Sequence, residues 1–195
     1  MPRQLLIIFV KNIVLGKVKT RLAKTIGNQN AFDVYKSLVS ITEKATENLT
    51  FDKHIYFSDV IIDTKWKDCS KFVQSEGNIG ERMLNAFKDG FKKGYEQIIL
   101  IGSDLPDLNS DIIQNGFNSL THSEIVFGPA KDGGYYLVGM NNYTPTLFED
   151  KPWSQSNLLT ETVKDLKSYA LIKELNDIDT IDDLRNSFLN NEFEF

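Results

Sequence analysis

The chain has 195 residues, a formal net charge of −5, 41% hydrophobic residues and 25% charged residues. This length and composition predict a single globular domain over residues 1–195. The only cysteine, Cys69, excludes an internal disulfide framework and a zinc site built from several cysteines. The acidic balance argues against duplex nucleic acid as a partner, and every apolar run is too short to span a membrane. We therefore expect a cytoplasmic protein that binds neither nucleic acid nor membrane.

Runs rich in β-branched and aromatic residues predict strands at Gln4–Val10, Lys53–Ser58, Lys71–Gln74, Gln97–Ile101, Glu124–Gly128, Tyr135–Met140 and Tyr169–Leu175. Helical spacing predicts helices at Asn28–Asn48, Glu81–Lys93, Ser110–Leu120 and from Ile181 or Asp182 to Asn190. This alternation predicts an α/β fold, a Rossmann-like three-layer α/β/α sandwich with a mixed, mostly parallel sheet. The short link between the fifth and sixth strands leaves no room for a crossover helix and predicts an antiparallel pair.

The loop after the first strand is strongly cationic. Five cations lie between positions 11 and 24: Lys11, Lys17, Lys19, Arg21 and Lys24. The sequence has no acid before Asp33. Phosphate groups commonly bind at such loops, beside the carboxyl edge of an open α/β sheet. The loop matches neither the P-loop nor the dinucleotide-binding glycine pattern. Taken alone, it fits a phosphate site or a solvated helix end equally well.

The segment Gly77–Met83 opens the second predicted helix, and its composition allows two interpretations. The amide dipoles of the first turn can receive a nucleotide near Gly80 and Arg82. The same residues are equally typical of an ordinary helix start.

The strand Gln97–Ile101 is apolar throughout, as expected of a central parallel strand covered on both faces. Asp104 follows its carboxyl end, above the crevice where open α/β sheets bind ligands. Carboxylate oxygens there suit Mg²⁺ or Mn²⁺ shared with phosphates, since Mg²⁺ takes only one or two protein carboxylates. For Asp107 we favour a turn role, because aspartate readily hydrogen-bonds its own backbone.

The link Gly128–Tyr136 contains Asp132 followed by paired glycines, Gly133 and Gly134. Glycine permits close backbone approach to a ligand, and Asp-Gly is also a strong hairpin signal. These two interpretations are compatible. We expect the link to address an acceptor substrate through five residues: Lys131, Asp132, Gly133, Gly134 and Tyr135.

Near the end of the chain, Thr180 and Asp183 have the spacing of a helix capping box. Asp179 precedes that cap and follows the last predicted strand. It is therefore our candidate for a second metal ligand beside Asp104.

Read together, these motifs resemble the DUF2064 group of glycosyltransferase-like proteins, in the nucleotide-diphospho-sugar transferase superfamily of the GT-A fold. More distantly they resemble 2-phospho-lactate guanylyltransferase and the molybdenum-cofactor nucleotidyltransferases. The matching motifs are Gly16-x-x-Lys19-Thr20-Arg21-Leu22, Gly77-x-x-Gly80-x-Arg82-Met83, Gly102-Ser103-Asp104-x-Pro106, Gly128-Pro129-Ala130-x-Asp132-Gly133-Gly134-Tyr135-Tyr136, Pro152-Trp153-Ser154 and Asp177-x-Asp179-Thr180.

The resemblance implies that nucleotide phosphates bind the first loop and that Mg²⁺ or Mn²⁺ binds Asp104 and Asp179. The nucleotide-binding residues that it implies are Gly16, Lys17, Lys19, Thr20, Arg21, Gly80 and Arg82. One departure concerns the first loop, where the family usually carries prolines. Here Lys11–Gly16 has none.

The function expected from this resemblance is metal-dependent nucleotidyl transfer from a nucleoside triphosphate to a small phosphorylated or hydroxylated acceptor. Pyrophosphate would leave, and the catalytic residues would be Lys19, Arg21, Asp104 and Asp132. The first alternative is glycosyl transfer from a nucleotide sugar, which the family's usual label favours. The second is a nucleotide-binding protein without catalytic activity. The cation-rich first loop favours a triphosphate over a nucleotide sugar.

Overall fold

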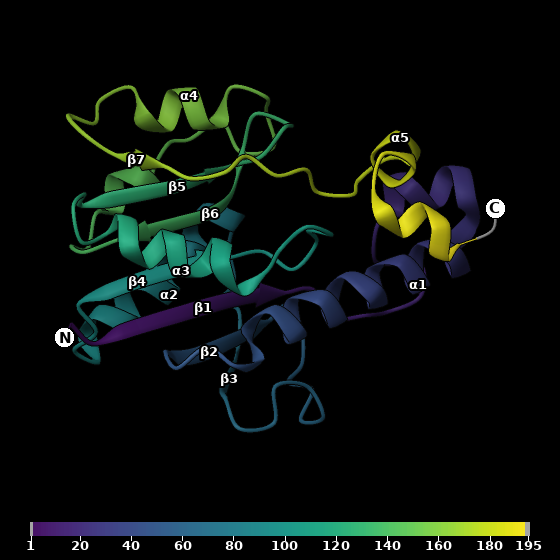
Figure 1. Ribbon diagram of the computed structural model, residues 1–195, viewed down its shortest axis with the longest axis horizontal. Helices are drawn as coiled ribbons and strands as arrows, with labels where there is room; N and C mark the ends of the chain where they lie inside the picture. Colours follow the sequence, from purple (N-terminus) through teal and green to yellow (C-terminus); the bar gives the residue numbers. More distant parts are fainter. Residues whose placement is uncertain (1, 194–195) are drawn as a thin grey trace.

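The computed structural model describes residues 2–193 and contains a seven-stranded sheet in the order β3-β2-β1-β4-β6-β5-β7 (Figure 1). The strands are β1 (Gln4–Val10), β2 (Asp52–Phe57), β3 (Ser70–Val73), β4 (Gln97–Ile101), β5 (Ile125–Pro129), β6 (Tyr135–Met140) and β7 (Ala170–Leu171). β1 pairs in parallel with β2 and β4, whereas β6 is antiparallel to both β4 and β5. The predicted antiparallel element in a mostly parallel sheet is therefore confirmed.

Helices cover both faces of the sheet (Figure 1). They are α1 (Thr20–Glu47), α2 (Ile79–Lys92), α3 (Ser110–Ser119), α4 (Leu158–Val163) and α5 (Ile181–Arg185), with 3₁₀ turns at Pro145–Leu147 and Phe188–Glu192. Residues of α1, α3 and α5 pack in one core cluster, and residues of α2 and α4 pack in the other. The three-layer sandwich predicted from the sequence is confirmed.

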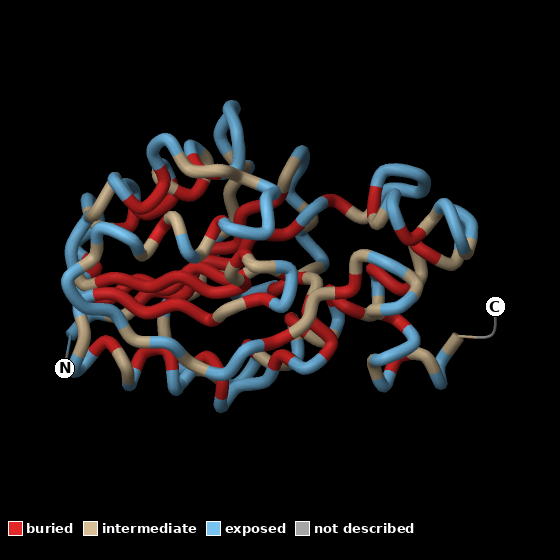
Figure 2. Tube along the Cα trace, turned by 90° about the horizontal axis from the view of Figure 1, so that it is seen from above, coloured by how far each residue is buried: buried red, intermediate tan, exposed pale blue. Residues whose placement is uncertain are grey.

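The central strands supply alternate side chains to the two cores, as the period of a strand requires. Leu6 and Ile8 of β1 face the α1 side, while Leu5 and Ile7 face the α2 side. Figure 2 shows the strands as a continuous buried layer between more exposed helices. None of the helices within residues 2–193 is long and apolar enough to cross a membrane.

Three predicted elements differ from the structure by more than two residues at one end, and the others agree within two. α1 begins at Thr20 instead of Asn28, because two helical segments join across a kink at Gly27, whose φ is 81°. The last helix ends at Arg185, and a separate 3₁₀ turn follows Ser187. The last strand is reduced to β7, because the chain beyond Leu171 leaves the sheet and makes only an isolated bridge between Ala130 and Leu175.

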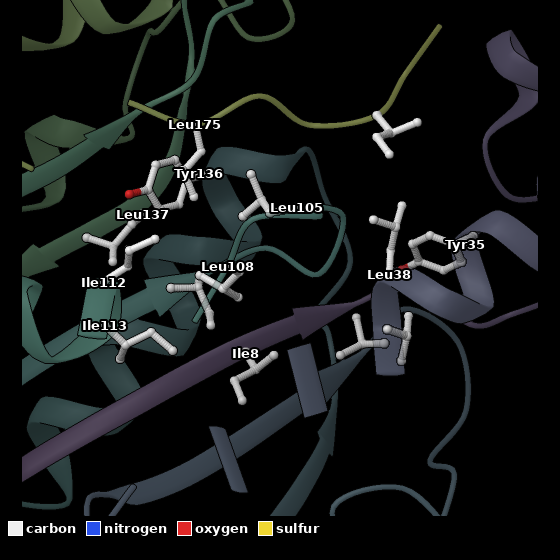
Figure 3. Packing of buried hydrophobic residues seen from close by; sticks show 14 of the residues in the cluster. Ile8, Tyr35, Leu38, Leu105, Leu108, Ile112, Ile113, Tyr136, Leu137 and Leu175 are labelled. Atoms are coloured by element: carbon white, nitrogen blue, oxygen red, sulfur yellow. The ribbon is translucent and has the colours of Figure 1, made fainter. Parts of the chain in front are cut away.

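The loop after β4 is fixed by the core beneath it. Leu105 and Leu108 are buried, and Figure 3 shows them in the same cluster as Ile113 of α3 and Leu137 of β6. Asp104 precedes this anchored segment. Its carboxylate is therefore carried by a loop with little freedom to move.

His54 in β2 is buried, and its Nδ1 has no hydrogen-bond partner within the described residues. It lies between the rings of Phe72 and Tyr95, at centroid distances of 5.0 and 5.6 Å. Burial, reinforced by the charge of Lys93, lowers the pKa of His54 to about 4. The folded protein therefore binds this proton less readily than the unfolded chain does.

We predict that this histidine makes the protein less stable in acid. Its contribution to stability is complete above pH 6.5 and is lost as the pH falls from 6.5 to about 4. Over that interval the free energy of unfolding should fall by roughly 2 kcal/mol more in the wild type than in His54→Gln. Urea unfolding at several pH values measures the difference. The control is His122→Gln, which makes the same substitution at an exposed histidine.

Candidate functional site

The polar centre of the site is an ion-pair network at the carboxyl edge of the sheet. Lys19 Nζ lies 3.0 Å from Asp104 Oδ2 and 3.2 Å from Asp179 Oδ1. Arg21 reaches the other oxygen of Asp179, with 3.3 Å between Nη1 and Oδ2. The network thus joins the start of α1, the loop after β4 and the segment before α5. The structure brings together four residues that the sequence singled out separately.

Lys19 is the buried member of this network. Its side chain is 6% exposed, whereas those of Asp104 and Asp179 are 38% and 41% exposed. Burial by itself would lower the pKa of Lys19, but the charges of Asp104 and Asp179 outweigh it and raise the pKa above its ordinary value. The ammonium therefore stays charged at any physiological pH. It forms ion pairs with two carboxylates.

The first loop is held by a side chain that sequence reasoning missed. Asn12 is buried, and its Oδ1 accepts hydrogen bonds from the backbone N–H groups of Asp59 and Val60 at 2.8 and 3.3 Å. Its Nδ2 donates to the Val60 carbonyl at 2.8 Å. These bonds fix the loop after β1 to the loop after β2. They restrain a loop that contains no proline between Lys11 and Gly16.

The remaining cationic residues lie on the outside of this loop. Gly16 adopts a φ of 76°, which glycine accommodates without strain, and the Lys17 N–H donates to the Val14 carbonyl at 3.0 Å. Lys17, Thr20 and Arg21 are exposed at the start of α1. They are accessible to a ligand at this edge of the sheet.

Tyr35 of α1 connects the loops after β1 and β4. Its hydroxyl accepts a hydrogen bond from the Lys11 N–H at 2.9 Å and lies 3.0 Å from Ser103 Oγ. Burial raises the pKa of Tyr35 to about 12, so the hydroxyl remains protonated. In the sequence this tyrosine is one of several apolar residues on a helix face, and nothing there indicates its role at the site.

A helix cap positions Asp179. The predicted capping box is present, because Thr180 Oγ1 accepts from the Asp183 N–H at 3.3 Å and Asp183 Oδ2 accepts from the Thr180 N–H at 2.7 Å. Asp183 Oδ2 also accepts from the Asp179 N–H at 3.2 Å. The cap therefore fixes the backbone of Asp179 while its carboxylate faces Lys19 and Arg21.

Asp177 is a site residue that the sequence prediction omitted. Burial, together with the nearby charge of Asp104, raises the pKa of Asp177 to about 6. The Asp177-x-Asp179 pair indicated it in the sequence, but only Asp179 was chosen as a candidate metal ligand.

A cavity of about 260 Å³ opens beside the network. Asp104, Asp132 and Asp177 contribute its acidic wall. The remaining wall is largely apolar and comes from β1, α2, β4, β6 and the segment 153–158, with Phe9, Ile79, Met83, Leu100, Tyr135, Val138, Trp153 and Leu158. Of the acceptor-binding residues predicted above, Asp132, Gly134 and Tyr135 line this cavity.

Two of the predicted ligand-binding glycines approach protein atoms instead. A Cβ on Gly133 would lie 1.8 Å from the Ser156 carbonyl oxygen, and a Cβ on Gly80 would lie 2.5 Å from the Trp153 ring. Both positions therefore need glycine for packing. Arg82 contacts the loop before its own helix, with Nε donating to the Gly77 carbonyl at 2.8 Å, and the Lys131 N–H donates to the Leu175 carbonyl at 3.0 Å.

The two predicted metal ligands suit a single divalent cation. Asp104 and Asp179 already share one cation, the Lys19 ammonium, so their oxygens converge on a common point. Within residues 2–193, no three His, Cys, Asp or Glu side chains form a metal cluster. A metal between these two carboxylates would need further ligands from solvent or substrate, as Mg²⁺ often has.

Comparison with known structures supports the predicted fold. A proposed nucleotide-diphospho-sugar transferase from Desulfovibrio desulfuricans G20 is 29% identical, with a TM-score of 0.88 over 97% of this chain and 91% of that one. A cytidylyltransferase from Leptospira borgpetersenii is 15% identical, with a TM-score of 0.59 over 94% of this chain and 84% of that one, and it shares the fold. The fold class is therefore that of the nucleotide-diphospho-sugar transferases.

Sequence comparison finds a relative that is named as a guanylyltransferase and a family to which the chain can be assigned. The 2-phospho-L-lactate guanylyltransferase of Methanocaldococcus vulcanius is 23% identical over 197 residues, which cover 96% of this chain and 86% of the relative. The sequence profile of DUF2064, described as an uncharacterized protein conserved in bacteria, matches residues 41–155, more than half of the chain. The chain belongs to the DUF2064 family.

Proposed function

We propose that this protein is a nucleotidyltransferase that moves a nucleotidyl group from a nucleoside triphosphate to a small acceptor. The observation that carries the proposal is the Lys19–Asp104–Asp179 network at the carboxyl edge of the sheet, flanked by the exposed Arg21. The likeness to a guanylyltransferase over nearly the whole chain supports this chemistry.

The proposed reaction is an in-line displacement at the α-phosphorus. The acceptor oxygen forms a bond to phosphorus, the bond to the bridging oxygen breaks, and pyrophosphate leaves. Asp132 lies in the cavity wall and receives the proton when the acceptor is a hydroxyl group. Such chemistry requires mainly positioning and charge neutralisation. Lys17, in the loop after β1, and Arg21, at the start of α1, supply exposed positive charge for the triphosphate.

We propose Asp104 and Asp179 as the ligands of Mg²⁺ or Mn²⁺, which when bound would neutralise charge on the phosphates. Lys19 occupies the point on which these carboxylates converge. Metal binding therefore requires the ammonium to move away, and phosphate oxygens are the anions available to receive it. In this proposal Lys19 pairs with the two carboxylates before the metal binds and with phosphate afterwards.

Glycosyl transfer from a nucleotide sugar is the second candidate. The specific observation in its favour is the TM-score of 0.88 to the proposed nucleotide-diphospho-sugar transferase. In that reaction the same network would face the diphosphate, and Asp132 would act as a base toward the acceptor. The exposed cations Lys17 and Arg21 favour the triphosphate, which carries more negative charge.

The variant Lys19→Ala tests the proposed metal ligands. Removing the ammonium leaves two partly exposed carboxylates facing each other, so the free energy of unfolding should fall by about 1–3 kcal/mol. Mg²⁺ without nucleotide should raise the melting temperature of Lys19→Ala more than that of the wild type, because the variant's carboxylates are free. The control is Lys24→Ala, whose side chain is exposed. Equal responses to Mg²⁺ in all three proteins would contradict the metal assignment.

The donor can be identified by thermal shift with each nucleoside triphosphate and several nucleotide sugars, with and without Mg²⁺. We expect one triphosphate with Mg²⁺ to stabilise the protein by about 2.7 kcal/mol at a concentration of 100 Kd. Asp104→Asn should lose the Mg²⁺-dependent part of this stabilisation. Stabilisation by nucleotide sugars alone would favour glycosyl transfer, and binding without pyrophosphate release from any acceptor tested would favour a non-catalytic protein.

The contact between the first loop and the outer phosphates has its own test. Arg21→Ala should weaken binding of the nucleoside triphosphate about tenfold and of the matching monophosphate much less, because the monophosphate lacks the β and γ groups. Isothermal titration measures both affinities, with Lys24→Ala as the matched loss of a nearby exposed cation. Equal losses for the two nucleotides would place Arg21 away from the outer phosphates.

A further inference from the structure

The cavity beside the ion-pair network contains a polar group that the protein leaves unsatisfied. The hydroxyl of Tyr135 is buried and has no hydrogen-bond partner within residues 2–193. The neighbouring Tyr136 hydroxyl, by contrast, donates to the Lys173 carbonyl at 2.7 Å. A buried hydroxyl without a partner is costly, and such groups occur where a ligand or water completes the bond. Tyr135 lines the cavity, but its hydroxyl is enclosed, so a ligand there satisfies it only when the side chain shifts.

The size of the cavity limits what it can hold. Its volume of about 260 Å³ lies below the roughly 300–1,000 Å³ typical of sites that enclose a whole drug-sized ligand. It can therefore enclose only part of a nucleoside triphosphate. Its apolar lining, which includes Phe9, Met83 and Trp153, suits a compact ring or branched alkyl group.

The charged residues that line the cavity are all acidic. Asp104, Asp132 and Asp177 line it, and neither lysine nor arginine is among its lining residues. The ammonium of Lys19 is already paired with Asp104 and Asp179. Even with a metal at Asp104, a phosphate or carboxylate on the bound group would face Asp132 and Asp177, and no lysine or arginine of the lining would offset their charge. A hydroxyl or amino group would instead find hydrogen-bond acceptors.

We propose that this cavity binds the acceptor substrate, and that the acceptor is a small, largely apolar molecule that reacts through a hydroxyl group and carries no anionic group. Its apolar part fills the cavity, a polar atom on it satisfies the Tyr135 hydroxyl, and its reacting hydroxyl lies at the aspartates. This inference rests on the proposed function. It narrows the acceptor to a class from which phosphorylated acids are excluded.

The binding test uses three probes that share one ring: benzyl alcohol, benzylamine and benzyl phosphate. The readout is the indole N–H signal of Trp153 in ¹H–¹⁵N spectra of the full chain, assigned with Trp153→Phe. Trp66, whose indole donates to Thr46 Oγ1 at 2.9 Å in the other core, is the internal control. We expect the alcohol and the amine to shift the Trp153 signal, with benzyl phosphate at least tenfold weaker and the Trp66 signal unchanged.

The hydroxyl is tested by a matched pair of variants. Tyr135→Phe removes an unsatisfied group and should raise the melting temperature of the ligand-free protein. Tyr136→Phe removes a hydroxyl that has a hydrogen-bond partner and should lower the melting temperature. Tyr135→Phe should still bind benzyl alcohol, because the apolar wall remains, but at least twofold more weakly than the wild type. A fall in melting temperature for both variants would show that the Tyr135 hydroxyl has a partner and would overturn its assignment.

Two further outcomes overturn the proposal. One is benzyl phosphate binding as tightly as benzyl alcohol, and the other is the absence of any Trp153 shift with the neutral and cationic probes. The nucleotide measurements are separate from these. If a triphosphate binds with Mg²⁺ while the probes fail, the acceptor class is wrong and the proposed function stands. If the probes bind and no nucleotide does, the proposed function is wrong.

Discussion

The ammonium group of Lys19 is the interaction on which this site depends. It joins three segments that are far apart in the chain: the start of α1, the loop after β4 and the residues before α5. Without that charge, Asp104 and Asp179 would repel each other at the edge of the sheet, with the partly buried Asp177 nearby. A single buried cation thus makes it possible to keep several carboxylates together.

The two sides of the site have different chemistry. The first loop and the beginning of α1 expose Lys17 and Arg21, whereas the cavity on the other side of Asp104 is acidic and apolar. Such a division suits a reaction between an anionic donor and a neutral acceptor, since each substrate would be repelled or left unpaired on the wrong side. Specificity would then come from charge as well as shape.

Much of this arrangement could be predicted from the sequence, because the direction of each strand decides which loop lies at the carboxyl edge of the sheet. Asp104 follows an unbroken apolar strand, and Asp179 precedes a recognisable helix cap, so both were expected at the crevice. The partners of Lys19 could not be predicted, since the spacing of cations in a loop does not reveal which side chain turns inward. Tyr35 and Asn12 were missed for a related reason. Their roles depend on contacts between distant loops, and neither belongs to a local motif.

The backbone at Lys19 has a consequence for how the network is built. Residues two apart on a regular helix point in different directions and do not face each other. Lys19, however, is the N-cap of α1 and adopts a left-handed conformation, with φ of 45° and ψ of 47°. This break in the helical path lets Lys19 and Arg21 both reach Asp179, one on each carboxylate oxygen. Because Lys19 adopts a conformation that usually favours glycine, two nearby cations bind the two oxygens of one carboxylate.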